Sequence, residues 1–167
     1  MAAALWAAKT IERPRGQTAY RILTTLGFVL LFAFWRSHIT RFWRFDSAWQ
    51  WAMVAIAALG FAFCWWARLY LGRLWSASIT RKENHSVVST GPYGLVRHPI
   101  YTGISLAAFA TALQEGNLIA LAGALILTLG WYVKARIEEG FLRTELGAQA
   151  YDAYAARVPM LVPFLKF

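Results

Sequence analysis

The sequence predicts an all-α integral membrane protein with about four transmembrane helices. Hydrophobic residues make up 59% of the 167 positions, nine Trp and eleven Phe are present, and the apolar residues are gathered into long runs. Average globular proteins are about 45–50% apolar. One short chain cannot bury this excess in a single small core, so we expect lipid to be its solvent. Length alone allows a single membrane domain, residues 1–167.

Four apolar runs define the expected membrane spans, which are residues 19–35, 48–71, 98–113 and 117–137. The first would form a helix of about 25 Å, short of the bilayer core of about 30 Å. Arg21 and Arg36 flank this run and can extend their charged ends toward water, which makes a short span acceptable. Only Gln114, Glu115 and Gly116 separate the last two runs. We therefore predict a tight C-terminal helical hairpin.

The charged residues predict the orientation of the chain. The two terminal regions and the central loop carry 14 Lys and Arg, whereas the first loop and the hairpin turn together carry 3. The positive-inside rule then places both termini in the cytoplasm, most simply in a cell inner membrane. The net charge of +9 is interpreted as membrane anchoring, and no nucleic-acid partner is expected.

The tail after the last span is amphipathic. From Glu138 to Tyr154 the apolar residues fall at steps of three and four, which is the spacing of a helix that lies on a surface. We therefore expect an amphipathic cytoplasmic tail helix.

Several kinds of site are excluded by the sequence. The single cysteine, Cys64, excludes an intramolecular disulfide and a cysteine-based metal cluster. His85 and His98 are too far apart in sequence for a zinc motif, so no metal site is expected. A Gly-x-Ser-x-Gly elbow and a phosphate-binding glycine loop are both absent.

The first candidate site lies in the Gly- and Pro-rich stretch 91–103, which contains Arg97, His98, Pro99 and Tyr101. A proline biases the preceding backbone away from helix, so Pro99 is expected to begin the third span. The free N–H groups at such a helix start can bind a carboxylate. A simple helix start with interfacial Arg, His and Tyr anchors is the alternative.

The second candidate site lies at the end of the last span and contains Lys134, Glu138 and Glu139. Acids beside a membrane helix are costly unless a cation neutralises them. Lys134 and Glu138 can pair one turn apart, which is the structural alternative. Glu139 then needs another cation, and a bound α-ammonium or sulfonium would serve. An antiparallel hairpin brings the two sites to one membrane face, so Tyr101 and Glu138 are expected to meet.

With these residues in place, the chain resembles the isoprenylcysteine carboxyl methyltransferase family and, more distantly, the membrane phospholipid N-methyltransferases. The resemblance covers roughly residues 70–167, in order and with near-family spacing. It is carried by His85 to Val88, Gly91 to Tyr93, Arg97 to Tyr101 with Gly103, Glu138, Glu139, Leu142, Gly147, Tyr151, Tyr154, Arg157 to Pro159, and Pro163 with Phe164.

The resemblance implies a membrane methyltransferase that uses S-adenosyl-L-methionine, bound by the part of the chain from residue 72 to residue 167. The implied cofactor-binding residues are His85, Ser86, Val87, Val88, Tyr93, His98, Pro99, Ile100, Tyr101 and Glu138. Arg97, Lys134 and Glu139 form the predicted catalytic set. Lys134 stands where the family has an arginine that holds a substrate carboxylate, and Glu139 would be the base for an amine acceptor.

The preferred prediction is carboxyl O-methylation of an isoprenylcysteine-like substrate. The expected partners are the bilayer and a membrane lipid or prenylated substrate, which would arrive between the helices. Two alternatives stay open: N-methylation of a phospholipid amine, and a non-catalytic membrane protein that keeps the fold.

Overall fold

The computed structural model describes residues 17–33, 41–72 and 88–165, and these residues form six helices. The predicted all-α fold is confirmed for this part of the chain. The helices are α1 (Thr18–Phe32), α2 (Ser47–Leu71), α3 (Pro92–Leu95), α4 (Pro99–Glu115), α5 (Leu118–Leu146) and α6 (Ala148–Arg157).

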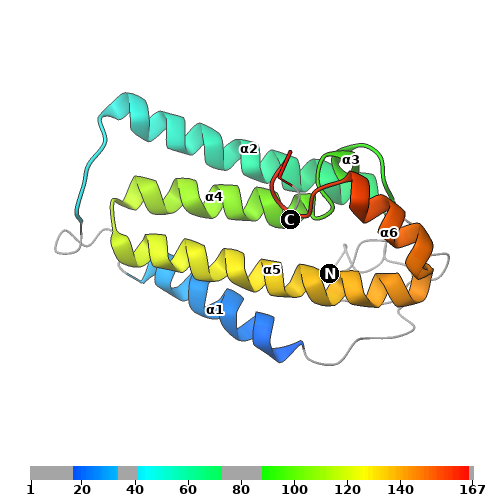
Figure 1. The fold of residues 1–167 in the computed structure, drawn as a ribbon. Coiled ribbons are helices and arrows are strands. Elements are labelled where there is room, and N and C mark those ends of the chain that lie inside the picture. The colour runs from blue at the N-terminus through cyan, green and yellow to red at the C-terminus, as the bar shows by residue number, and fades with distance from the viewer. Residues whose placement is uncertain (1–16, 34–40, 73–87, 166–167) are drawn as a thin grey trace.

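The four long helices lie side by side in the order α2, α4, α5, α1 (Figure 1). The hairpin of α4 and α5 is central, with α2 packed on α4 and α1 packed on α5. The short helices α3 and α6 lie at the end of the bundle opposite the hairpin turn (Figure 1). This arrangement places the start of α4 beside the last turns of α5, which is where both candidate sites were expected.

The outer helix pairs approach closely through glycines. A Cβ atom on Gly27 of α1 would collide with the backbone of Leu127 in α5, and one on Gly123 would collide with the backbone of Leu31. In the other pair, Gly60 and Gly103 face each other's backbone in the same way. Small residues at such positions let helices pack in lipid, where van der Waals contact replaces the hydrophobic effect.

Gly123→Ala is expected to destabilise the α1–α5 pair. The added methyl group has no space, and overpacking of this kind costs about 1–3 kcal/mol. Gly140→Ala is the matched control, because Gly140 lies on the same helix and has open space around its Cβ position. That control should leave the free energy of unfolding unchanged or raise it by about 1 kcal/mol. Thermal unfolding in detergent measures both, and equal stabilities would contradict the close approach.

The predicted hairpin turn is confirmed. Helix α4 ends at Glu115, Gly116 adopts a left-handed φ of 67°, and the side chain of Asn117 accepts from the N–H of Ile119 to cap α5. The segment before α2 covers the turn, since the Phe42 N–H donates to the Gly116 carbonyl and the Trp43 indole N–H donates to the Leu113 carbonyl.

The tail helix expected over residues 138–154 is divided between two helices in the structure. Helix α5 does not end near residue 137 but continues to Leu146, so Glu138 and Glu139 lie within it. The break falls at Gly147, which has a φ of 90°, and the tail helix α6 starts only at Ala148. The change from an apolar to an amphipathic pattern at residue 138 therefore falls inside one continuous helix.

Two of the described helices, α2 and α5, are long and apolar enough to cross a membrane by length and composition. The shorter α1 is also apolar. Large apolar side chains on α2 are exposed, among them Trp51, Phe61 and Trp65. Such a surface is expected to face lipid, because soluble monomers rarely expose contiguous apolar patches of this kind.

Candidate active site

The start of α4 has the conformation that its prolines predict. Val96 is extended, His98 has φ −125° and ψ 65°, and Pro99 occupies the first turn of the helix. Outside the helix ladder, the backbone N–H groups of Arg97 and His98 donate to the carbonyls of Pro159 and Met160, at 2.8 and 3.1 Å. The C-terminal segment is therefore hydrogen-bonded directly to the backbone of the predicted site.

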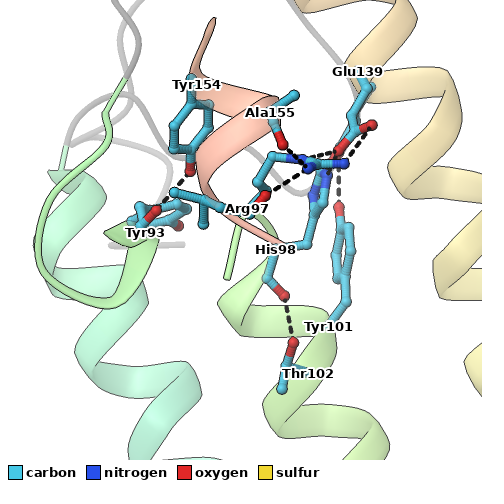
Figure 2. Close-up of polar contacts among 10 residues, drawn as sticks. Tyr93, Arg97, His98, Tyr101, Thr102, Glu139, Tyr154 and Ala155 are labelled. Atoms are coloured by element: carbon cyan, nitrogen blue, oxygen red, sulfur yellow. Dashed lines mark hydrogen bonds and ion pairs between the residues drawn. The ribbon is translucent and has the colours of Figure 1, made fainter. Parts of the chain in front are cut away.

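The Arg97 side chain joins α5, the tail and the start of α4 (Figure 2). Its Nε and Nη2 atoms donate to the two Glu139 oxygens at 2.7 and 3.2 Å. Its Nη1 atom donates to the carbonyls of Ala155 and Val158 at 2.9 and 2.6 Å. All three guanidinium nitrogens are thus engaged, in the bidentate geometry that makes arginine–carboxylate pairs strong.

The Glu139 carboxylate is paired with side chains of the protein itself. Besides Arg97, the His98 Nε2 atom lies 3.1 Å from Glu139 Oε1. The Glu139 side chain is only 13% exposed. The ligand cation that the sequence suggested for this acid is therefore not needed, and the carboxylate is occupied by structural partners.

Glu138 is the more accessible acid and connects the two candidate sites. Its Oε1 atom accepts from the Tyr101 hydroxyl at 2.7 Å, and its Oε2 atom lies 3.5 Å from His98 Nδ1. Lys134 Nζ is 3.9 Å from Oε1. The predicted meeting of Tyr101 and Glu138 is confirmed, so the hairpin does bring both sites together.

The ammonium of Lys134 lies among three aromatic rings, which we call the aromatic cage. Its Nζ atom is 5.1 Å from the centroid of Tyr101 and 5.4 Å from those of Trp131 and Tyr20. The residue is only 4% exposed. Ring faces carry negative electrostatic potential and attract cations, more so where water is excluded. The cage and Glu138 together stabilise a charged lysine at a buried position.

Three rings of the site form a continuous stack. His98 and Tyr101 are nearly parallel with centroids 5.4 Å apart, and Tyr101 and Trp131 follow with centroids 5.0 Å apart. The stack joins the start of α4 to the middle of α5 and fixes the ring that faces Lys134.

Tyr93 and Tyr154 dock α6 on α3. The Tyr154 hydroxyl donates to the Tyr93 carbonyl at 2.7 Å (Figure 2). Burial raises the pKa of both phenols, so both stay protonated over the working pH range and Tyr154 keeps its donor.

Tyr154→Phe removes this one hydrogen bond and leaves a buried carbonyl unpaired. We expect the free energy of unfolding to fall by about 1 kcal/mol, while the ring contact with Tyr151 is kept. Tyr132→Phe is the control, because that ring is exposed. Denaturant unfolding followed by circular dichroism measures the difference, and equal midpoints would show that the bond contributes nothing.

The remaining predicted residues are placed as follows. Pro99 is fully buried, and the Ile100 carbonyl accepts from the Cys64 thiol on α2. Val88 is half-buried a few residues before α3. His85, Ser86 and Val87 lie outside the described residues.

Two aromatic residues of the site were missed by the sequence reasoning. Trp131 was interpreted as part of the interfacial aromatic belt, and Tyr20 lies on α1, far from the motif. The spacing of Trp131, Lys134 and Glu138 is three and then four residues, which puts all three on one face of a helix. That pattern was available in the sequence, whereas nothing local pointed to Tyr20.

In the described part of the chain, no group of three or more His, Cys, Asp or Glu residues could hold a metal ion. The site that remains is a buried lysine, an accessible carboxylate and a stack of aromatic rings. Such a site can hold a cation against the carboxylate and rings, and an anion against the ammonium.

The described residues form a helical bundle with two membrane-length helices and a charged, aromatic candidate site at one end. The chain belongs to the isoprenylcysteine carboxyl methyltransferase family, whose family model matches residues 53–143.

Individual relatives extend this match. The chain is 31% identical over 170 residues to methanethiol S-methyltransferase 2 of Bradyrhizobium diazoefficiens, covering 96% of this chain and 64% of that protein. It is 28% identical over 171 residues to a methanethiol S-methyltransferase of a Pseudomonas species, covering 95% and 64%. It is 36% identical over 89 residues to protein-S-isoprenylcysteine O-methyltransferase B of Arabidopsis thaliana, covering 53% and 45%. The chain thus spans less than two thirds of the length of these relatives.

Proposed function

We propose that this chain is an S-adenosylmethionine-dependent membrane methyltransferase whose acceptor is a small thiolate. The observation that carries the proposal is the buried Lys134 ammonium, held in the aromatic cage next to Glu138. A cation beside a carboxylate gives one site that suits an anionic acceptor and another that suits a cationic donor. Family membership supports the reaction class.

The residues present fit S-adenosylmethionine. Its α-ammonium needs an acid, and Glu138 is the more exposed of the two acids, with a side chain 18% exposed against 13% for Glu139. Its sulfonium is a cation of the kind that aromatic rings attract, and Tyr101 supplies such a ring beside Glu138. When bound, the cofactor supplies the methyl group. We assign the methionine portion to Glu138, with Tyr93 and residues 98–101 as further contacts.

The lysine at position 134 favours a thiolate over a carboxylate. A guanidinium matches the two oxygens of a carboxylate with two parallel hydrogen bonds, whereas an ammonium is a compact point charge. A thiolate presents its charge on one atom and loses nothing by this exchange. The relatives that align with nearly the whole chain are named methanethiol S-methyltransferases, which supports the same choice.

Carboxyl O-methylation of an isoprenylcysteine-like substrate is the second candidate. The family match and the Arabidopsis relative favour it. N-methylation of a phospholipid amine is the least favoured acceptor chemistry. An amine must lose a proton, and the predicted base, Glu139, is occupied by Arg97 and His98.

Methyl transfer to a thiolate requires little acid–base catalysis from the protein. Once bound, S-adenosylmethionine would supply the methyl group to the acceptor sulfur and would leave as a neutral thioether, and the thiol proton would be lost to solvent as the thiolate forms. An anion and a cation become two neutral thioethers, so a site that excludes water accelerates the step. The contribution of Lys134 is to hold the acceptor in line, and that of Glu138 is to fix the donor.

Radiolabel transfer tests the acceptor. Purified full-length chain in detergent is incubated with methyl-labelled S-adenosylmethionine and, separately, methanethiol, S-farnesylcysteine or phosphatidylethanolamine. We expect label in dimethyl sulfide. Label only in the farnesylcysteine ester would establish the second candidate. A folded chain that binds the cofactor at no concentration up to the millimolar range would overturn the methyltransferase assignment.

We also propose that α1, α2, α4 and α5 all cross the membrane, with both termini and the site on the cytoplasmic side. The asymmetry of Lys and Arg between the loops supports this orientation. Terminal fusions of green fluorescent protein and alkaline phosphatase test it. Fluorescence at both ends is expected, and phosphatase activity at either end would contradict it.

A further inference from the structure

Trp131 carries an unsatisfied hydrogen-bond donor within the site. Its indole Nε1 atom is buried, and it has no hydrogen-bond partner among the described residues. An indole N–H is a donor only, and a buried donor without a partner costs about 1–3 kcal/mol. The ring stacks on Tyr101 and lies beside the Lys134 ammonium. Neither contact accepts a hydrogen bond from the indole N–H.

The position of Trp131 links that donor to the acceptor side of the site. The ring stacks on Tyr101 and forms one wall of the aromatic cage around Lys134 Nζ. Tyr20 of α1 supplies another ring of the aromatic cage. The Lys134 side chain is buried. A ligand atom that contacts the Lys134 ammonium is therefore also near the indole ring.

The chemistry of the pair selects the ligand. An ammonium and an N–H are both donors, and neither can accept a hydrogen bond. The group that satisfies both is a negatively charged acceptor atom. A cationic headgroup or a neutral amine would leave the indole unsatisfied and would be repelled by the ammonium.

We propose that Trp131 is an acceptor-binding residue, whose indole N–H donates to the anionic atom of the methyl acceptor while Lys134 supplies the opposing charge. This inference rests on the proposed function and adds to it a second contact that fixes the direction of the acceptor. It explains why a tryptophan occupies the helix face of Lys134 and Glu138, where any apolar residue would pack.

Trp131→Phe is the sharpest test, because it keeps a stacking ring and removes the N–H. With methanethiol as acceptor we expect the KM to rise about tenfold or more, as for the loss of a hydrogen bond to a charged partner. The dissociation constant of S-adenosylmethionine and the melting temperature should stay near those of the parent. Trp65→Phe is the matched control, since Trp65 is exposed on α2, and its KM should not change.

A spectroscopic measurement separates binding from packing. In the ¹⁵N-labelled chain saturated with S-adenosylhomocysteine, addition of methanethiol should move the indole N–H resonance that Trp131→Phe abolishes. An unmoved resonance, or an unchanged KM in Trp131→Phe, overturns the inference while the parent still methylates thiol. If the parent instead methylates S-farnesylcysteine, the same shift and KM change are expected with that acceptor. A parent that binds no cofactor overturns the proposed function, and the inference with it.

Discussion

Arg97→Ala is expected to release the C-terminal segment and to destabilise the whole site end of the bundle. The change leaves Glu139 largely buried beside His98, and it leaves the carbonyls of Ala155 and Val158 without the guanidinium as their donor. Breaking a buried pair from one side costs about 3–5 kcal/mol. Thermal unfolding and limited proteolysis of the tail measure the two consequences.

Two further variants make this prediction specific. Arg143→Ala is the matched control, because Arg143 also joins α5 to α6, through Asp152, but both side chains are more than half exposed. Exposed ion pairs contribute little, so this variant should unfold like the parent. Arg97→Met combined with Glu139→Leu removes both partners and should recover part of the loss. If Arg97→Ala keeps the parent's stability and a protected tail, the arginine does not fasten these segments.

Glu138→Gln is expected to weaken the binding of S-adenosylmethionine by roughly 10- to 100-fold. The amide keeps the size of the side chain but loses its charge, and a hydrogen bond to a charged partner contributes about 1.5–3 kcal/mol. The Tyr101 hydroxyl can still donate to the amide oxygen, so the fold should be preserved. Isothermal titration calorimetry measures the affinity, and a dissociation constant equal to the parent's would remove Glu138 from the cofactor site.

Lys134→Met should have the complementary effect. The substitution keeps a flexible chain in the aromatic cage but removes the ammonium, so turnover of an anionic acceptor should fall while cofactor affinity is spared. Because Lys134 also pairs with Glu138, cofactor affinity must be measured in the same preparation. Lys134→Arg should restore part of the turnover, and more of it with a carboxylate than with a thiolate acceptor. Loss of cofactor binding alone would place Lys134 on the donor side.

Hydropathy predicted the helix positions well, but the expected tail helix over residues 138–154 is divided between α5 and α6. The starts at Pro99 and Asn117 follow from local chemistry, a proline in the first turn and an asparagine cap. Between Lys134 and Leu146 no proline interrupts the helix, and the one glycine, Gly140, is tolerated because nothing crowds it. The change from an apolar to an amphipathic pattern was taken for the end of an element. Only Gly147, with its positive φ, ends the helix.

The site was predictable where it depends on the hairpin and not where it depends on the tail. Antiparallel arms with a short turn must bring Tyr101 to Glu138, and they do. The partners of Arg97 are different, because two of them are backbone carbonyls about 60 residues away. No residue type marks such an acceptor, since every residue has one. The role of Tyr20 could not be predicted either, because its contact with Lys134 depends on how α1 packs on α5.

The attachment of residues 155–161 to the start of α4 has a consequence for biogenesis. The carbonyls of Pro159, Met160 and Leu161 accept from Arg97, His98 and Thr102, so the candidate site is completed by residues that are synthesised after the six described helices. The hydrophobic helices can therefore form before this segment is synthesised, and the start of α4 gains these hydrogen bonds only once the segment docks. A chain cut before residue 158 would therefore lack these three acceptor carbonyls at the site end of its bundle.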